Sequence, residues 1–276
     1  MSITPFRTPI APSLVKEAYL ALLKKGWRPG DRDLKTPRNL KIETGIIEKA
    51  EGSALVKLGN TQVIAGVKAD IGSPFRDTPD QGVLTVHAEF VPLASPMFEP
   101  GPPDENAIEV ARVVDRSLRE VGAVDLPSLA IIPGEKVWVV WVDLYVIDHD
   151  GNLFDASMLA TMAALLTARL PAYEESESGE ILLKRGTPGE PIKVNTWITT
   201  VTTAKIGGYV VVDPNLEEEA ISDVRLVTAL DSGGRIVGMQ KTGMGGLTTR
   251  DVERMIEYSI EASKVYFKAL EDSIKR

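Results

Sequence analysis

Hydrophobic and polar residues follow two different spacings along the chain, and these spacings predict its elements. Apolar residues at helical spacing predict a helix over residues 12–25, which Gly26 ends. A basic loop rich in Pro and Gly follows, and from Lys41 the pattern changes to runs of β-branched residues. The turn signal Gly59-Asn60 separates two of these runs and predicts a hairpin.

Groups of strands followed by helices occur twice. In the first half, strands precede a helix at 105–121, and a long strand precedes an apolar helix at 155–169. In the second half, two groups of strands precede a long helix from Thr249 to Ile274, with Thr248 as its N-cap. The strands are expected within 40–52, 53–72, 83–93, 135–152, 192–214 and 220–243. This order predicts an α+β fold made of a duplicated unit, with helices on one side of each sheet.

The length of 276 residues corresponds to one or two domains at about 150 residues each. We expect residues 1–276 to form a single domain whose halves cover about 30–170 and 190–276. The segment 173–191 between the halves is acidic and rich in turn residues. It is interpreted as a surface loop and not as a boundary between independent domains.

Charge and composition exclude several classes of protein. With 31 Lys and Arg against 39 Asp and Glu, the formal charge of −8 excludes wrapping of nucleic acid by bulk positive charge, although local basic patches remain open. The absence of cysteine excludes disulfides, thiolate catalysis and Cys-based metal sites. No apolar stretch approaches the ~20 residues that cross a bilayer. We therefore expect a soluble, cytoplasmic protein with no membrane partner.

Three other features are weaker candidates for chemistry. His87 lies in a predicted strand and His149 in a turn, and two separate histidines favour neither catalysis nor a metal site. The glycine-rich segment 242–251 precedes a helix but lacks the Lys-Ser/Thr of a P-loop, which favours a hairpin-to-helix turn. A cluster of carboxylates can bind Mg²⁺ or act as acid and base, although a solvated helical turn is the commoner meaning of such a run. Its members are Asp213, Glu217, Glu218, Glu219 and Asp223.

The helix predicted at 105–121 is the most informative element. At about 100° per residue, Arg112, Arg116 and Arg119 fall within an arc of about 60°. The planar fork of Arg binds phosphate bidentately, so this stripe indicates contact with an RNA backbone. The alternative is a solvated basic face paired with its acidic neighbours. Apolar residues point the opposite way, toward a core: Val110, Val114, Leu118 and Val121.

Four motifs carry a resemblance to a known family. They are GSALVKLGNTQVIAGVK at 52–68, ENAIEVARVVDRSLRE at 105–120, DHDGNLFDASMLA at 148–160 and VDPNLEEEAISDVRLV at 212–227. The chain resembles the RNase PH family over about residues 30–270, and it is most similar to the non-catalytic RNase PH-like subunit of the archaeal exosome core. The resemblance implies a duplicated βαβα fold related to the second domain of ribosomal protein S5.

The resemblance also implies an assembly and an activity. Members of the family form six-membered rings around a pore that threads single-stranded RNA. In the archaeal exosome the ring is a trimer of heterodimers of this subunit and a catalytic RNase PH-like subunit, and RNA-binding cap subunits lie on top. The assembly shortens RNA from its 3′ end by phosphorolysis and releases nucleoside diphosphates.

The chain departs from the pattern of the active members at the phosphate site. In the turn that matches residues 150–157, active members have Gly followed by Ser/Thr-Arg, which hold the attacking phosphate. The corresponding residues here are Asn152, Leu153 and Phe154. An apolar pair cannot neutralise phosphate. An Arg pair before the helix motif is likewise replaced, by Asn106 and Ala107.

These departures predict a non-catalytic ring subunit. It is expected to complete the active site of its partner and to bind RNA through Arg112, Arg116 and Arg119. It is expected to need no metal or cofactor, and Asp223, which aligns with the catalytic Asp of the family, is at most a vestigial acid. One alternative is an active phosphate-dependent 3′-to-5′ exoribonuclease with Asp223 as its acid. An alternative of another class is a small-molecule kinase with an S5-like fold, whose phosphate loop would be residues 242–251.

Overall fold

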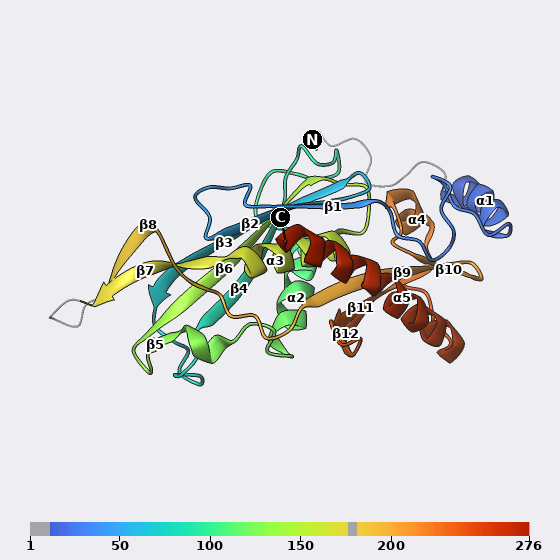
Figure 1. The fold of residues 1–276 in the computed structure, drawn as a ribbon. Helices are drawn as coiled ribbons and strands as arrows, with labels where there is room; N and C mark the ends of the chain where they lie inside the picture. The colour runs from blue at the N-terminus through green and yellow to red at the C-terminus, as the bar shows by residue number, and fades with distance from the viewer. Residues whose placement is uncertain (1–11, 176–180, 276) are drawn as a thin grey trace.

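The computed structural model describes residues 12–175 and 181–275, and its first half is built on a six-stranded sheet (Figure 1). The strand order is β1-β2-β3-β6-β4, and β5 pairs with β6. Neighbours are antiparallel except β4 and β6, which are parallel. The strands are β1 Leu40–Thr44, β2 Gly52–Leu58, β3 Thr61–Gly72, β4 Val83–Phe90, β5 Ala130–Ile132 and β6 Lys136–Asp148.

The second half is a four-stranded antiparallel sheet in the order β10-β9-β11-β12. Its strands are β9 Ile198–Ile206, β10 Tyr209–Val212, β11 Val224–Asp231 and β12 Ile236–Thr242. The helices are α1 Pro12–Leu23, α2 Glu105–Arg119, the 3₁₀ turn η1 Leu126–Leu129, α3 Leu153–Thr167, α4 Leu216–Ile221 and α5 Thr249–Ile274. Each half ends in a helix after its strands, so the α+β fold predicted from the repeated order is confirmed.

Helix α3 lies between the two sheets and carries the core. It packs against β2 and β3 of the first sheet and against β9 of the second. All residues from Leu153 to Leu165 are buried, as expected for a helix that is apolar or small on every side. Gly52 of β2 allows the close approach, because a Cβ there would lie 2.4 Å from the carbonyl oxygen of Ala164. The helix predicted at 155–169 is therefore present, shifted two residues toward the amino terminus.

The segment 173–191 differs from its prediction as a surface loop. Strands β7 Arg169–Glu175 and β8 Ile181–Pro191 pair as an antiparallel hairpin that projects from the body of the molecule (Figure 1). The loop interpretation is wrong for the described part of this segment, and residues 176–180 lie outside it. Its Pro and Gly residues fall at register shifts near the base of the hairpin, where interrupted pairing tolerates them.

The amino-terminal helix packs on the second half. Tyr19 and Leu23 of α1 are buried against Ile206 and Ile221, in an apolar cluster separate from the main core. Gly26 follows the helix with φ +80°, the left-handed conformation that commonly ends helices, so the predicted helix and its stop are confirmed.

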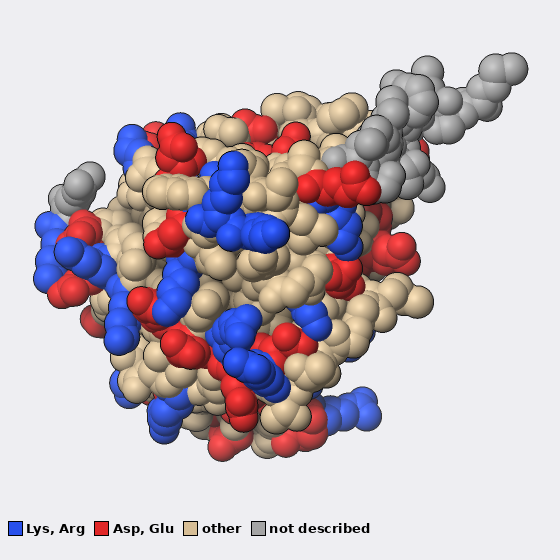
Figure 2. Space-filling view, turned by 90° about the vertical axis from the view of Figure 1, so that its right-hand side faces the viewer, with Lys and Arg blue, Asp and Glu red and all other residues tan. Residues whose placement is uncertain are grey.

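On the face turned toward the viewer in Figure 2, basic and acidic side chains are intermixed.

The largest apolar cluster draws on both halves of the chain, through α2, α3, α5 and strands of both main sheets. The interpretation of residues 1–276 as one domain with two related halves stays a prediction. Within the described ranges, no helix is long and apolar enough to cross a membrane.

Candidate functional site

Helix α2 begins at a well-defined cap and presents two arginines to solvent. The Asp104 side chain accepts a hydrogen bond from the Ala107 backbone N–H at 2.8 Å, which fixes the first turn. Val110, Val114 and Leu118 are buried, as the spacing predicted. Arg112 and Arg116 are exposed and line the same groove.

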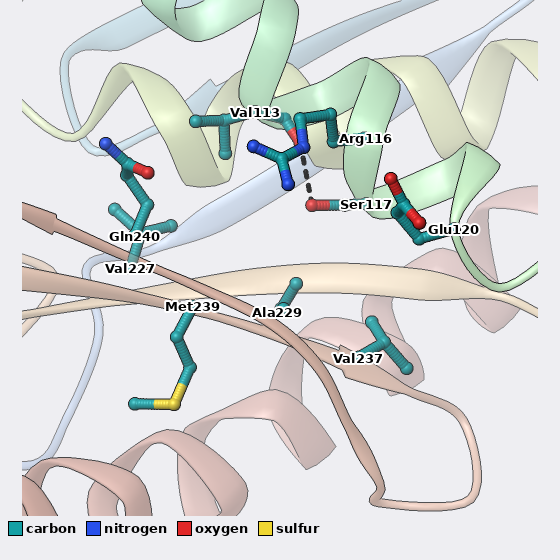
Figure 3. A pocket seen from close by; sticks show the side chains of 10 residues that line it. Val113, Arg116, Ser117, Glu120, Val227, Ala229, Val237, Met239 and Gln240 are labelled. Carbon is teal, nitrogen blue, oxygen red and sulfur yellow. Dashed lines mark hydrogen bonds between the residues drawn. The ribbon is translucent and has the colours of Figure 1, made fainter.

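That groove continues between α2 and the edge of the second sheet (Figure 3). The guanidinium of Arg116 points into the space between the helix and strands β11 and β12. Val227 and Ala229 of β11 line its strand side, and Gln240 of β12 donates to Glu109 at 3.1 Å. Arg116 lines both hollows, whereas Arg112 lines only the one on the outer side of the helix. The lining also includes carboxylates, those of Glu105, Glu109 and Glu120.

Arg119 lies apart from the other two arginines. Its guanidinium pairs with Asp115 at 2.6 Å and donates to the Leu84 carbonyl oxygen at 2.7 Å. It lines a different hollow, beside η1 and the loop before β4. The structure therefore brings together Arg112 and Arg116 and separates Arg119, a difference that the helical angle alone does not reveal.

The turn before α3 has an unusual backbone and an unusual set of side chains. Gly151 and Asn152 both have positive φ, +81° and +56°. The Asn152 amide does not cap the helix, because it donates to Asp155 at 2.7 Å and to Asp213 at 2.6 Å. Leu153 and Phe154 are 9% and 6% exposed and pack into the core. At this turn the Asn152 amide nitrogen is therefore already bound to two carboxylates, and the side chains of Leu153 and Phe154 are apolar.

An aromatic cavity of about 210 Å³ lies beside this turn. The rings of Phe98 and His149 stack with centroids 5.2 Å apart, and Phe90 and Phe154 add to the lining. Burial lowers the pKa of His149, although Glu219 and Asp150 act in the opposite direction. His149 thus favours its neutral form and contributes a ring rather than a charge.

Two of the five members of the predicted acidic cluster are internal. Asp213 and Glu218 have fully buried side chains, and they pair with Arg38 at 2.7 Å and with Arg28 at 2.6 Å. The prediction of a magnesium site or a solvated turn is wrong for these two carboxylates, because the loop after α1 supplies their cations. Paired and hydrogen-bonded charges are the form in which buried charges persist. Sequence reasoning missed Arg28, Arg32 and Arg38, and their only signal was the basic composition of that loop.

Two buried carboxyl groups share the Asn152 amide and titrate differently. Burial raises the pKa of Asp155 to about 7, although hydrogen bonds that Thr202 and Asn152 donate to its carboxyl group lower this pKa in part. Burial also acts to raise the pKa of Asp213, but the hydrogen bonds and charge of Arg38 hold it below its ordinary value. The Tyr266 hydroxyl completes this network with a donation to Asp155 at 3.3 Å.

Asp223 faces α1 and does not line the aromatic cavity. Its carboxylate pairs with Lys16 at 2.6 Å and accepts from the Gly207 N–H at 2.7 Å, and its side chain is 35% exposed. The glycine-rich segment 242–251 joins antiparallel β12 to α5, and Thr248 and Asp251 form a capping box. The hairpin-to-helix interpretation is confirmed, and no parallel β-α-β context for a P-loop surrounds it.

Neither histidine belongs to a metal site in the described part of the chain. His87 is exposed on β4 beside Glu89, with 3.3 Å between its Nε2 and the carboxylate. Across residues 12–175 and 181–275, no group of three His, Asp or Glu side chains is arranged to hold a metal ion.

Comparisons with known proteins agree with this geometry. The sequence profile described as "3' exoribonuclease family, domain 1" matches residues 36–171, and "3' exoribonuclease family, domain 2" matches residues 197–262. The chain therefore belongs to the 3′ exoribonuclease family and has the RNase PH fold, as the resemblance implied.

Particular relatives narrow this class. A protein of Aeropyrum pernix named "Exosome complex component Rrp42" is 80% identical over 275 residues, which is 100% of both chains. The structure described as "archaeoglobus fulgidus exosome with RNA bound to the active site" is 45% identical at a TM-score of 0.84 and covers 94% of this chain and 99% of that chain. A chain of an "Archaeal exosome core" structure is 41% identical at a TM-score of 0.79, with coverage of 94% and 97%.

Proposed function

We propose that the chain is a non-catalytic, RNA-binding subunit of an exosome ring in the cytoplasm. It assembles with a catalytic RNase PH-like partner, as a trimer of heterodimers, and with RNA-binding cap subunits. The observation that carries the proposal is the turn before α3. There, Leu153 and Phe154 pack into the core, and the Asn152 amide nitrogen donates its hydrogen bonds to two buried carboxyl groups. A phosphorolytic site needs donors for phosphate at this turn, and these residues supply none from their side chains.

The exposed arginines of α2 support the RNA-binding part of the proposal. Arg112 and Arg116 share one groove, and bidentate contacts from guanidinium groups to phosphate oxygens are independent of base sequence. Arg119 contributes less, because its guanidinium is already held by Asp115 and must leave that partner to reach a phosphate. The subunit would thus hold the RNA backbone while its partner cleaves.

The test compares each subunit alone with the assembled pair. The chain is co-purified with a catalytic RNase PH-like subunit, and release of nucleoside diphosphates from single-stranded RNA is followed against phosphate concentration. We expect no release by the lone chain at any phosphate concentration and phosphate-dependent release by the mixture. Release by a clean preparation of the lone chain would overturn the non-catalytic role.

The alternative of an active phosphate-dependent exoribonuclease is favoured by one observation. Asp223, the counterpart of the family's catalytic Asp, remains partly exposed. If this alternative holds, the lone chain releases nucleoside diphosphates and Asp223→Asn abolishes the release. If the proposal holds, Asp223→Asn leaves the activity of the assembled ring unchanged.

A further inference from the structure

Helix α4 is docked directly on the turn before α3. A Cβ on Gly151 would lie 2.5 Å from the carbonyl carbon of Asn215 and from the backbone nitrogen of Leu216. The Leu216 N–H also donates to the Asp150 carbonyl oxygen at 3.1 Å. This contact holds the start of α4 against residues 150–152, which precede α3. It thereby brings Glu219 of α4 to the amino terminus of α3.

The Glu219 carboxylate is held there by an amide and a guanidinium. Its Oε1 accepts from the Asn152 N–H at 3.0 Å and pairs with Arg225 Nη1 of β11 at 2.5 Å. Its side chain is 13% exposed. A backbone N–H at a helix amino terminus together with an Arg fork is the set of donors that binds a phosphate group.

Helix α3 depends on this outside carboxylate because it has no side-chain cap of its own. Asn152 is the N-cap residue, but its side chain makes no capping hydrogen bond and faces Asp155 and Asp213. The first N–H groups of a helix have no partner within the helix, and the macrodipole places partial positive charge on them. The amino terminus of this 15-residue helix therefore favours a bound anion, and the Glu219 carboxylate is the anion that the structure places there.

We propose that the Glu219 carboxylate is an internal anion that occupies a phosphate-type site at the amino terminus of α3 and keeps inorganic phosphate out of it. The site is composed of the Asn152 N–H and the Arg225 guanidinium, and one oxygen of Glu219, Oε1, contacts both. This inference deepens the proposed non-catalytic function, since it adds an occupied anion site to the missing ligands. Its own test requires neither RNA nor a partner.

The test uses the isolated full chain and inorganic phosphate, with binding measured by isothermal titration calorimetry. Wild type is expected to show no binding, whereas Glu219→Ala is expected to bind phosphate with a Kd on the order of 1–10 mM. The double variant Glu219→Ala/Arg225→Ala should lose the gained binding. Glu217→Ala is the matched control, because Glu217 lies on the same helix but accepts from Tyr19 and should gain nothing.

Thermal unfolding with and without phosphate gives a second readout. Glu219→Ser removes the carboxylate and most of its bulk but keeps a small polar group, so it serves if Glu219→Ala unfolds. Phosphate raises the Tm of many proteins by exclusion from their surface, so the informative quantity is the additional rise over wild type. We expect an additional rise for Glu219→Ser and none for Glu217→Ala.

Two outcomes would overturn the proposal. If phosphate binds the wild-type chain and the Glu219 variants with the same affinity, Glu219 does not keep phosphate out of the site. If the Glu219 variants have a lower Tm but neither bind phosphate nor gain an additional rise, Glu219 is only a structural partner of Arg225. Neither outcome bears on RNA degradation by the assembled ring, so failure here is distinguishable from failure of the proposed function.

Discussion

At the residue scale, arginine side chains have two different environments in this molecule: some are buried and paired with carboxylates, and others are exposed to solvent. Arg28 is 2% exposed and is satisfied by Glu218 and by the carbonyl oxygens of Val212 and Asp213. Arg112 is exposed on α2. Buried pairs of this kind hold elements together, whereas exposed guanidinium groups are available to phosphate.

Replacement of Arg112 and Arg116 together by Ala should weaken RNA binding by the assembled complex without a loss of folding. Their side chains leave α2 on the side opposite buried Val110 and Val114, so their removal opens no cavity in the core. Each lost phosphate contact should reduce the slope of log affinity against log salt by about 0.7 for single-stranded RNA. The effect should be similar for different RNA sequences, because phosphate contacts carry no base information.

The matched control for the arginine variants is Arg169→Ala. Arg169 begins β7 and donates to the Gly189 carbonyl oxygen, away from α2. Its replacement should leave the salt slope unchanged. If the double variant of α2 binds and degrades RNA like wild type across a salt series, the arginines form only a solvated face.

The buried carboxyl of Asp155 should make stability depend on pH in a defined direction. Burial raises its pKa from 3.8 to about 7, so the native state binds a proton that the unfolded state has already released. Its contribution therefore falls as pH rises from about 4 to about 7, by up to about 4 kcal/mol. Asp155→Asn cannot titrate, so its free energy of unfolding should decline less over this window in urea titrations. Parallel pH profiles of the two proteins would contradict this assignment.

At the element scale, the junction of α3 and α4 determines the geometry of the site. Gly151 gives way to Asn152 in a left-handed turn, and α4 packs onto that turn through Asn215 and Leu216. The capping box of Asn215 and Glu218 starts α4 at this point, and Glu218 also binds Arg28. One short helix thus connects the loop after α1 with the amino terminus of the central helix.

Substitution of Gly151 by Ala should therefore be costly for two reasons. Its φ of +81° is unfavourable for a residue with a Cβ, and that Cβ would lie 2.5 Å from the backbone of α4. Gly134→Ala is the matched control, because Gly134 has φ +84° with nothing within 4 Å. In urea unfolding, Gly134→Ala should cost about 1–2 kcal/mol and Gly151→Ala at least about 2 kcal/mol more. Equal costs would show that α4 moves freely away from the turn.

At the scale of the whole molecule, the chain is a family member that offers arginines but no phosphate ligands from its turn side chains. Under the proposed non-catalytic function, the chain functions only beside a catalytic relative. We expect a stable hetero-oligomer whose interface is on the scale of permanent complexes, above about 2,000 Å². Light scattering should show a higher mass after the catalytic partner is mixed with the chain. Unchanged masses in the mixture would argue against an obligate assembly.

Prediction from the sequence worked best where the information is local. Helical spacing placed the core side of α2 and the apolar helix α3, and residue type placed the N-cap Thr248 at the start of α5. It failed for the hairpin β7–β8, because polar, Pro-containing strands lack the alternation that indicates burial. It also failed for Asp213 and Glu218, whose cations lie 175 and 190 residues away in the chain.

The sequence by itself determined the α+β order, the exposed arginines of α2 and the apolar residues at the turn before α3. Each of these follows from residue type and from spacing within one element. Only the tertiary structure decided that Arg119 is held by the Leu84 carbonyl and that Glu219 reaches the amino terminus of α3. The physical reason is that hydrogen bonds and ion pairs between distant segments depend on where packing of α3 between the sheets brings them, and no periodicity encodes that placement.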